Sequence, residues 1–351
     1  MDDDRAVELL EAMLRIPSLC GEEDALATML LKAMSDAGFA ASRDEVGNVI
    51  GRVGPAGAAR TIVVLGHMDT VPGAIAVERR DGALYGRGAV DAKGPLAAAI
   101  VAASRARTAL RVTVIGAVQE EGPSLGARHL ASLPAPDFLI IAEPSGWDSV
   151  VLGYKGSLRF TVRITQPASH SAGREPTAAE RLVAFWNELS AWCAAQSPPR
   201  DDSADKGGFN HLTATLIAVA SSGDGLRDEA SMRIGLRLPP GISIEIARQG
   251  AEALLPQGGF DFQPGEEAVR SGKGTPLVAA FLRAIRSQGG TPRFKVKTGT
   301  SDMNVVGPVW RCPMVAYGPG DSNLDHTPNE HIVLDEYLRA VGVLRGVLEG
   351  I

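Results

Sequence analysis

The apolar positions in the first 150 residues follow two spacings that predict two kinds of element. Leucine, valine and methionine recur at helical spacing within 7–14 and again within 26–30. Short continuous apolar runs bounded by turn residues predict buried strands at 48–53, 61–66, 111–118 and 137–142, and an Ala-rich helix is expected at 95–104. Helices that alternate with continuous apolar strands are typical of an α/β sheet covered on both faces.

The pattern changes near residue 155. Residues 158–164 alternate apolar with polar, as a strand with one exposed face does. The chain then predicts the ferredoxin-like order βαββαβ, with elements at 158–164, 177–195, 212–220, 231–238, 243–255 and 260–262. The α/β character resumes with a helix at 276–287, strands at 293–297 and 314–317, and a closing helix at 334–348.

We therefore expect a catalytic α/β domain at 1–154 and 267–351, with a second domain inserted at 155–266. A polar stretch with two glycines, 201–208, is expected to be a flexible loop of the inserted domain.

Composition and charge narrow the class of protein. A length of 351 residues predicts about two domains. The fractions of 45% hydrophobic and 22% charged residues argue against disorder, and the net charge of −6 argues against a general nucleic-acid binder. No apolar run is long enough to predict a membrane span, and the acidic N-terminus does not resemble a signal peptide. Cys20, Cys193 and Cys312 match no disulfide or zinc pattern, so we expect a cytoplasmic protein.

Six acidic or imidazole side chains stand directly after apolar strands or in Gly-rich turns. Such positions mark the carboxyl edge of an α/β sheet, where these folds place their sites. The six residues are His67, Asp91, Glu120, Glu121, Glu143 and His326.

This set suits two divalent metal ions. Zinc takes imidazole nitrogen and carboxylate oxygen, and one carboxylate can bridge two ions. Two histidines and three acids would give each ion one histidine and one terminal acid, with Asp91 shared. Glu120 then has no ion to bind and stands beside a ligand. This is a suitable position for the general base that deprotonates a metal-bound water. Asp69, two residues from His67, can accept the second imidazole N–H. Any one of these residues alone would more often be a helix cap, a solvated turn or a core histidine.

Three motifs resemble the M20 metallopeptidases, a family that includes acetylornithine deacetylase and succinyl-diaminopimelate desuccinylase. The motifs are the segments 66–72, 86–94 and 120–122. The resemblance implies an α/β zinc-peptidase domain with an inserted ferredoxin-like lid and dimerisation domain. It also implies two Zn²⁺ or Co²⁺ ions per subunit, held by His67, Asp91, Glu121, Glu143 and His326, with Asp91 as the bridge. Asp69 would orient His67, Glu120 would be the general base, and the peptide bond after Asp91 would often be cis.

A narrower resemblance, to the LysK branch of this family, rests on the segments 142–145, 153–156, 297–304 and 317–320. Enzymes of that branch release lysine or ornithine from the γ-carboxyl of the C-terminal glutamate of a small acidic amino-group carrier protein. The resemblance implies this amidohydrolase reaction, in lysine or arginine biosynthesis, with the carrier as partner. The alternatives are deacetylation of N-acetyl-lysine or N-acetyl-ornithine, cleavage of another small M20 substrate, and a binding protein that lost its metals. Neither nucleic acid nor a membrane is expected as a partner.

For several further residues the sequence allows both a functional and a structural interpretation. His170 matches the lid histidine of the family, which polarises the scissile carbonyl in the partner subunit of a homodimer; otherwise it is an idle loop residue. Arg237 would bind a substrate carboxylate or lie solvated on a strand. Thr300 and Ser301 would donate hydrogen bonds to substrate or cap the following helix. A basic stripe consists of Arg286, Arg293, Lys295 and Lys297. It would either dock the carrier or form a solvated face.

Overall fold

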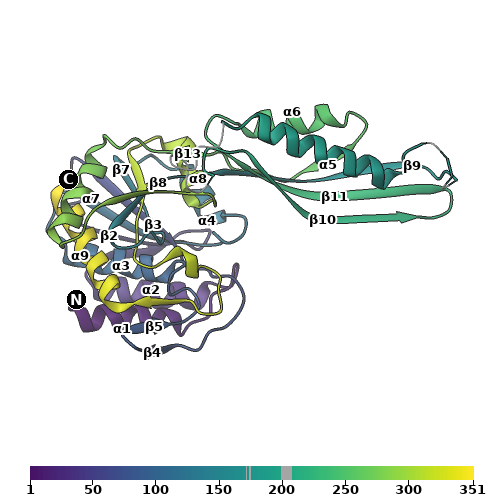
Figure 1. The fold of residues 1–351 in the computed structure, drawn as a ribbon. Coiled ribbons are helices and arrows are strands. Elements are labelled where there is room, and N and C mark those ends of the chain that lie inside the picture. Colours follow the sequence, from purple (N-terminus) through teal and green to yellow (C-terminus); the bar gives the residue numbers. More distant parts are fainter. Residues whose placement is uncertain (171, 174, 199–207) are drawn as a thin grey trace. The chain divides into compact units, whose positions relative to one another are not determined.

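A computed structural model of the chain describes residues 1–170, 172–173, 175–198 and 208–351. The chain divides into two compact units, one of Met1–Gly153, Ser271–Val296 and Ser301–Ile351, the other of Tyr154–Arg270 and Lys297–Thr300. Tyr154 and the segments 267–270 and 297–300, expected in the catalytic domain, group instead with the second unit. The predicted loop at 201–208 lies outside the described residues apart from Gly208. Figure 1 follows the chain by colour.

A mixed sheet forms the centre of the first unit (Figure 1). Its strands follow the order β1-β2-β6-β3-β7-β15-β8. The middle strands β6, β3, β7 and β15 run parallel, whereas β1, β2 and β8 pair antiparallel with their neighbours. The bounds are β1 Ala40–Arg43, β2 Val49–Val53, β3 Thr61–His67, β6 Arg111–Ala117, β7 Phe138–Ile141, β8 Ser149–Tyr154 and β15 Met314–Ala316. Two further short strands are β14 Arg293–Lys297 and β13 Val269–Arg270, of which β13 belongs to the second unit.

Helices bury both faces of this sheet. One face, with Val64, Val114 and Ile140, shares a continuous apolar core with helices α1, α2, α3, α7 and α9. The alternate side chains, such as Leu65 and Ile115, are also buried, as expected for a parallel sheet covered on both sides. The helices of this unit are α1 Asp3–Leu14, α2 Asp24–Asp36, α3 Lys93–Arg105, α4 Leu125–Ala131, α7 Pro276–Ser287, α8 Asp302–Trp310 and α9 Leu334–Gly350, with a 3₁₀ turn at Ser322–Leu324.

A small antiparallel sheet of the first unit was not predicted from the sequence. It has the order β16-β5-β4, with β4 at Glu78–Arg80, β5 at Ala83–Tyr85 and β16 at His331–Val333. Each strand is only three residues long, too short to show a period of two in the sequence. Its pairing brings the chain around residue 331 beside the chain around residue 85.

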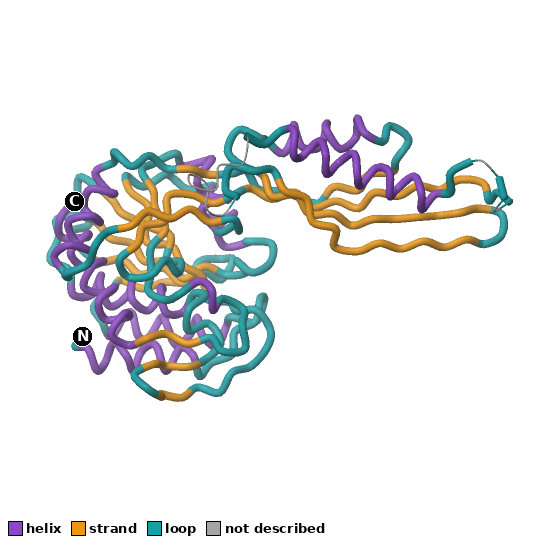
Figure 2. The backbone as a smooth tube through the Cα atoms, in the orientation of Figure 1, coloured by secondary structure: helices purple, strands orange, loops and turns teal. Residues whose placement is uncertain are grey.

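The second unit has the predicted order βαββαβ. Its sheet follows β10-β11-β9-β12, with β9 Gly156–Pro167, β10 Thr213–Gly223, β11 Arg227–Leu238 and β12 Gly259–Phe262. Strand β9 alternates buried and exposed positions as predicted. Its buried side chains pack with those of α5, Ala178–Ala195, and α6, Ile244–Leu254. Figure 2 shows the two helices along the strands of this unit.

The helix starts follow the local sequence. Thr177 and Glu180 form a capping box at the start of α5, because each side chain accepts the other's backbone N–H. Thr275 caps α7, and Pro276 occupies its first turn, where no amide donor is needed. In the part of the chain that the structure describes, every helix is too short or too polar to cross a lipid bilayer.

Candidate metal centre

The candidate residues gather at one edge of the central sheet. His67 is the last residue of β3, Glu120 and Glu121 follow β6 after a two-residue step, and Glu143 follows β7. Because β3, β6 and β7 are parallel, their carboxyl ends meet at the same edge. The strand periods of the sequence therefore predict this convergence.

His67 lies at the centre of the first group of candidate ligands. The imidazole is buried, with 1% of the side chain exposed. Its Nε2 lies 3.1 Å from Asp91 Oδ1 and 3.6 Å from Glu143 Oε1. Its Nδ1 faces Asp69, 2.9 Å from the backbone oxygen and 3.4 Å from Oδ1. His67, Asp91 and Glu143 bring one ligand atom each within 4.8 Å of one another.

His326 forms the second group with Glu121 and Asp91. Its Nε2 lies 2.8 Å from Glu121 Oε1 and 3.0 Å from Asp91 Oδ2. These three residues also bring ligand atoms within 4.8 Å of one another. About half of the His326 side chain is exposed, so the centre opens to solvent on this side. The His326 backbone is left-handed, with φ of 61°, a conformation that costs energy in a residue with a side chain.

Asp91 belongs to both groups. Its Oδ1 faces the buried His67, and its Oδ2 faces His326. A carboxylate whose two oxygens point to two imidazoles is the arrangement needed to bridge two cations. The following peptide bond, Asp91–Ala92, is cis.

Asp69 holds three parts of the centre together. Its side chain is fully buried and faces His67, while Oδ1 accepts the N–H of Glu120 at 3.0 Å and Oδ2 accepts that of Glu121 at 2.9 Å. Hydrogen bonds to ionised carboxylates are among the stronger ones in proteins. Asp69 thus fixes both the imidazole ring and the turn that carries the two glutamates.

The electrostatics of the centre favour bound cations. Burial disfavours a charged His67, but hydrogen bonds to Asp69 and Asp91 prevail and raise its pKa well above the usual range. The hydrogen bond to Asp91 and the Glu121 charge raise the pKa of His326 to about 9. Burial opposes the charge on Asp91 as well, yet its pKa is held well below the usual range by hydrogen bonds from both imidazoles. The donor set of imidazoles and carboxylates fits zinc or a similar ion.

Glu120, which precedes Glu121 in the turn after β6, belongs to neither group of candidate ligands. Burial raises the pKa of Glu120 well above its usual range, and the charges of Glu143, Asp302 and Asp91 add to this effect against the opposing charge of His67. Asp302 was not singled out in the sequence, because an acid in the first turn of a helix is usual there.

The other predicted site residues lie outside the two groups of candidate ligands. His170 lies exposed in the second unit, where its Nδ1 accepts the N–H of Ala172 at 3.1 Å. Arg237 lies half-buried on β11, and Thr300 groups with the same unit. Ser301 is buried at the start of α8 and forms a capping box with Asn304, so the helix-cap alternative describes it.

Two groups near the centre were missed in the sequence. Cys20 and Glu23 bring ligand atoms within 4.8 Å of Asp69. Glu330 lies four residues after His326 and is fully buried. Its position two residues after the segment 325–328, which carries His326, is the signal that the sequence offers.

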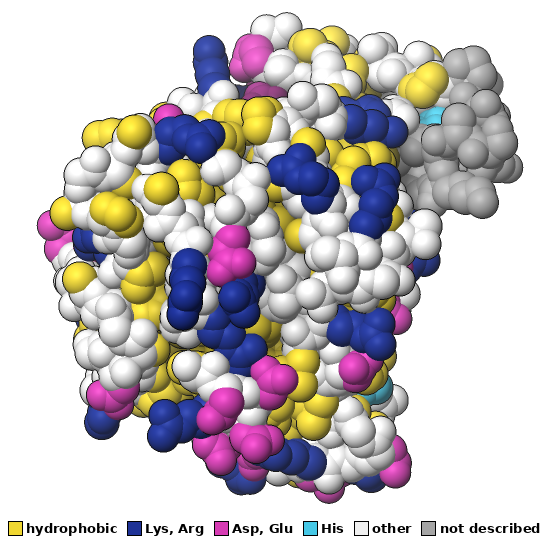
Figure 3. Space-filling model, turned by 90° about the vertical axis from the view of Figure 1, so that its left-hand side faces the viewer, with side chains coloured by type: hydrophobic (Ala, Val, Ile, Leu, Met, Phe, Trp, Pro, Cys, Tyr) yellow, Lys and Arg dark blue, Asp and Glu magenta, His cyan; other side chains and the backbone are white. Residues whose placement is uncertain are grey.

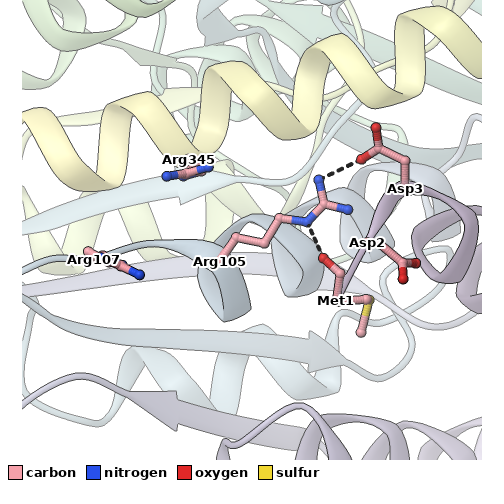
Figure 4. Close-up of a pocket in the computed structure, with 6 residues that line it drawn as sticks. All are labelled: Met1, Asp2, Asp3, Arg105, Arg107 and Arg345. Atoms are coloured by element: carbon pink, nitrogen blue, oxygen red, sulfur yellow. Dashed lines mark hydrogen bonds and ion pairs between the residues drawn. The ribbon is translucent and has the colours of Figure 1, made fainter.

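A separate pocket of about 550 Å³ lies at the N-terminal end of the first unit and is lined by Met1, Asp2, Asp3, Arg105, Arg107 and Arg345 (Figure 4). Arg105 donates to the Met1 carbonyl at 2.8 Å and pairs with Asp3 at 2.8 Å, as the dashed lines in the figure mark. No histidine lines this pocket, so its chemistry differs from that of the metal centre.

The family model for peptidase family M20/M25/M40 matches residues 63–350. The chain belongs to this family. It is thus a metal-dependent amidohydrolase, as the resemblance implied. The [LysW]-lysine hydrolase of Deinococcus radiodurans is 47% identical over 355 residues, covering 99% of this chain and 97% of that protein. The [LysW]-lysine/[LysW]-ornithine hydrolase of Saccharolobus islandicus is 29% identical, covering 78% of this chain and 77% of that protein.

Solved structures of the M20 family share the fold. A metallo-carboxypeptidase from Sulfolobus solfataricus has a TM-score of 0.80 at 18% identity, covering 100% of this chain and 99% of that one. A dinuclear metal-binding peptidase from Bacillus subtilis has a TM-score of 0.73 at 14% identity, covering 99% and 97%. The α/β fold class predicted from the sequence is confirmed by this likeness.

Binding of metal ions should release protons, since an imidazole ligates only when neutral. The pKa of about 9 means that metal-free His326 is mostly protonated at about pH 7.5, so affinity should increase with pH until that value is passed. Calorimetry of Zn²⁺ binding to the metal-free protein, in buffers of different ionisation enthalpy, measures the released protons. His326→Ala should release fewer. His129→Ala, which removes an imidazole near Asp44, serves as control and should release as many as the wild type. Equal release from all three proteins would contradict the expectation.

Proposed function

We propose that the chain hydrolyses the amide that joins lysine or ornithine to the C-terminal glutamate of a small acidic carrier protein. The observation that carries the hydrolytic chemistry is the position of Asp91 between His67 and His326. The substrate is supported by the names of the relatives, the first of them 47% identical over nearly the whole of both chains. The reaction would supply free lysine or ornithine for amino-acid biosynthesis.

Two divalent ions, Zn²⁺ or Co²⁺, are part of the proposal. His67 and Glu143 would hold one ion, Glu121 and His326 the other, and Asp91 would hold both. When bound, such ions polarise the amide carbonyl and make water more acidic. Asp69 would keep His67 in the ring orientation that presents Nε2 to the ion.

Glu120 would act as general base and then as general acid. It would take a proton from the attacking water as the new C–O bond forms on the amide carbon. When the C–N bond breaks, the same proton would pass to the leaving amine, so that the carboxylate is regenerated. The raised pKa of Glu120 suits the first of these steps, because it makes the carboxylate a stronger base toward the attacking water.

The second unit would serve as lid and dimerisation domain, with His170 reaching the partner's site as a hydrogen-bond donor to the developing oxyanion. The support for a dimer is strand β10. It lies at the edge of its sheet and pairs only with β11 among the described residues. It exposes Leu216, Ile217 and Val219, with 37%, 41% and 61% of each residue accessible. A long, exposed, apolar edge strand is a template for pairing with another chain.

Arg237 would bind a substrate carboxylate. It has no ion pair in the part of the chain that the structure describes, and burial together with the neighbouring charge of Arg159 lowers its pKa. A half-buried guanidinium without a counter-ion attracts a bidentate anion. Thr300, which groups with the same unit, would donate a hydrogen bond to the substrate. Ser301 would donate such a bond only in addition to capping α8.

The basic stripe would be the surface on which the carrier docks. Two residues of the basic stripe have partners inside the first unit: Arg293 pairs with Asp148 at 2.7 Å, and Lys295 donates to the Ser145 carbonyl at 2.6 Å. The net charge of −6 is spread unevenly, since Lys and Arg side chains gather in the middle of the face in Figure 3 and Asp and Glu below them. An acidic carrier can therefore meet basic surface on an acidic protein.

The free thiols of Cys20, Cys193 and Cys312 fit a reducing, cytoplasmic compartment.

Purified enzyme should release lysine or ornithine from the carrier faster than it deacetylates N-acetyl-lysine or N-acetyl-ornithine. The comparison of kcat/KM for the four substrates, with amino-acid analysis as readout, tests the carrier hypothesis. A preference for the acetylated amino acids would favour the small-substrate alternative, and loss of all four activities with two bound metals would favour a binding protein.

Glu120→Gln should lower kcat by about 10²–10⁴-fold, because it removes the proton carrier. Metal content should stay near that of the wild type, since Glu120 belongs to neither ligand group. Glu78→Gln, which changes an exposed glutamate of β4, is the matched control and should leave kcat unchanged. Full activity of Glu120→Gln would disprove the role.

A mixture of two inactive variants tests the dimer. His170→Ala and Glu120→Gln should each be inactive alone. Mixed dimers would hold one complete site, so an equal mixture that exchanges subunits should regain roughly a quarter of wild-type activity. Mixtures that stay inactive although mass spectrometry shows mixed dimers, or an active monomer, would contradict a histidine supplied in trans.

A further inference from the structure

We propose that the buried ion pair of Arg87 and Glu330 is a positioning device that holds the two metal ligands Asp91 and His326 in place. The two residues take part in neither ligand group. The inference rests on the proposed two-metal site but not on the proposed substrate.

Glu330 grips the backbone of the bridging ligand. Its residue surface is fully buried, and Oε1 accepts the N–H of Val90 at 3.0 Å and that of Asp91 at 3.1 Å. Two amide donors on one oxygen fix the direction in which the Asp91 side chain leaves the chain. The bridging position needs such control, because Asp91 must serve two imidazoles at once.

Arg87 extends the same device to the second histidine. Its Nη1 donates to Glu330 Oε2 at 2.7 Å and to the Thr327 carbonyl, the residue after His326, at 3.2 Å. Its Nε donates to the Gly73 carbonyl at 2.9 Å. The guanidinium thus ties the turn that carries His326 to the loop that leads into Asp91. This contact also helps to hold His326 in its left-handed backbone conformation.

The small sheet fixes Glu330 itself. Glu330 precedes β16, which pairs with β5, and its carbonyl accepts the N–H of Gly86 at 3.3 Å. Arg87 follows directly after Gly86. The ion pair therefore joins two backbone segments that are already hydrogen bonded, and little side-chain freedom is left to either partner.

A charged carboxylate is needed at position 330. The Arg87 side chain is only 13% exposed and Glu330 only 1%, so either charge without the other would be buried and unpaired. An amide at 330 could keep the contacts of one oxygen, but its NH₂ group would face the Arg87 donors. The substitution Glu330→Gln thus leaves the size of the side chain nearly unchanged and removes the negative charge that pairs with Arg87.

The test is Co²⁺ binding to metal-free protein, followed by visible absorption in competition with a chelator. Glu330→Gln should bind both ions about 10–100-fold more weakly, the usual effect of losing an outer-shell partner. Circular dichroism and the melting temperature of the metal-free variant establish that it is folded. Glu11→Gln is the matched control, since Glu11 pairs with Arg79 at 2.6 Å on the surface of the same unit and should bind Co²⁺ as the wild type does.

Arg87→Lys provides a second measurement. It keeps a charge for Glu330 but cannot reach Glu330, Thr327 and Gly73 together. It should weaken the ion held by His326 and spare the one held by His67, so that one of two binding steps shifts. Wild-type Co²⁺ affinity in a folded Glu330→Gln, or two unchanged steps in Arg87→Lys, would overturn the proposal. If Glu330→Gln does not fold, Arg87→Lys decides the question alone.

Discussion

The site depends on one arrangement, in which a single carboxylate lies between two imidazoles. Asp91 can serve both only if its oxygens point in fixed directions, and everything around it restricts those directions. The parallel strands bring His67 and the glutamates to the same edge, and the loop before α3 carries Asp91 to them. A shift of about one ångström in that loop would disturb the contacts of Asp91 with both imidazoles together.

Two buried carboxylates that accept hydrogen bonds from backbone amides support the centre. Asp69 accepts the amides of Glu120 and Glu121, and Glu330 accepts those of Val90 and Asp91. Neither acid has to bind an ion to do this. The cluster of negative charge is therefore built on rigid main chain, and the mutual repulsion of its carboxylates is relieved by imidazolium in the metal-free protein or by bound cations.

Much of this was predictable because the relevant signals are local. Continuous apolar strands with an acid or histidine after each one predict the sheet and its active edge, and the change to alternation at Leu158 predicts the inserted unit. Glu330 was not predictable in this way, since its partners Val90 and Asp91 lie 240 and 239 residues away in sequence. The three-residue strands that place it carry no measurable period. Ser301 shows the opposite case, where one sequence pattern suited both a cap and a ligand contact.

The ends of the inserted unit lie side by side. Ser157 and Glu266 exchange two backbone hydrogen bonds of 2.8 Å, so the long segment between them begins and ends at one closed pair. A segment whose ends already meet costs its host almost no additional loop entropy, however long it is. In evolutionary terms, such a segment can accept insertions at little cost to the sheet that carries the candidate metal centre.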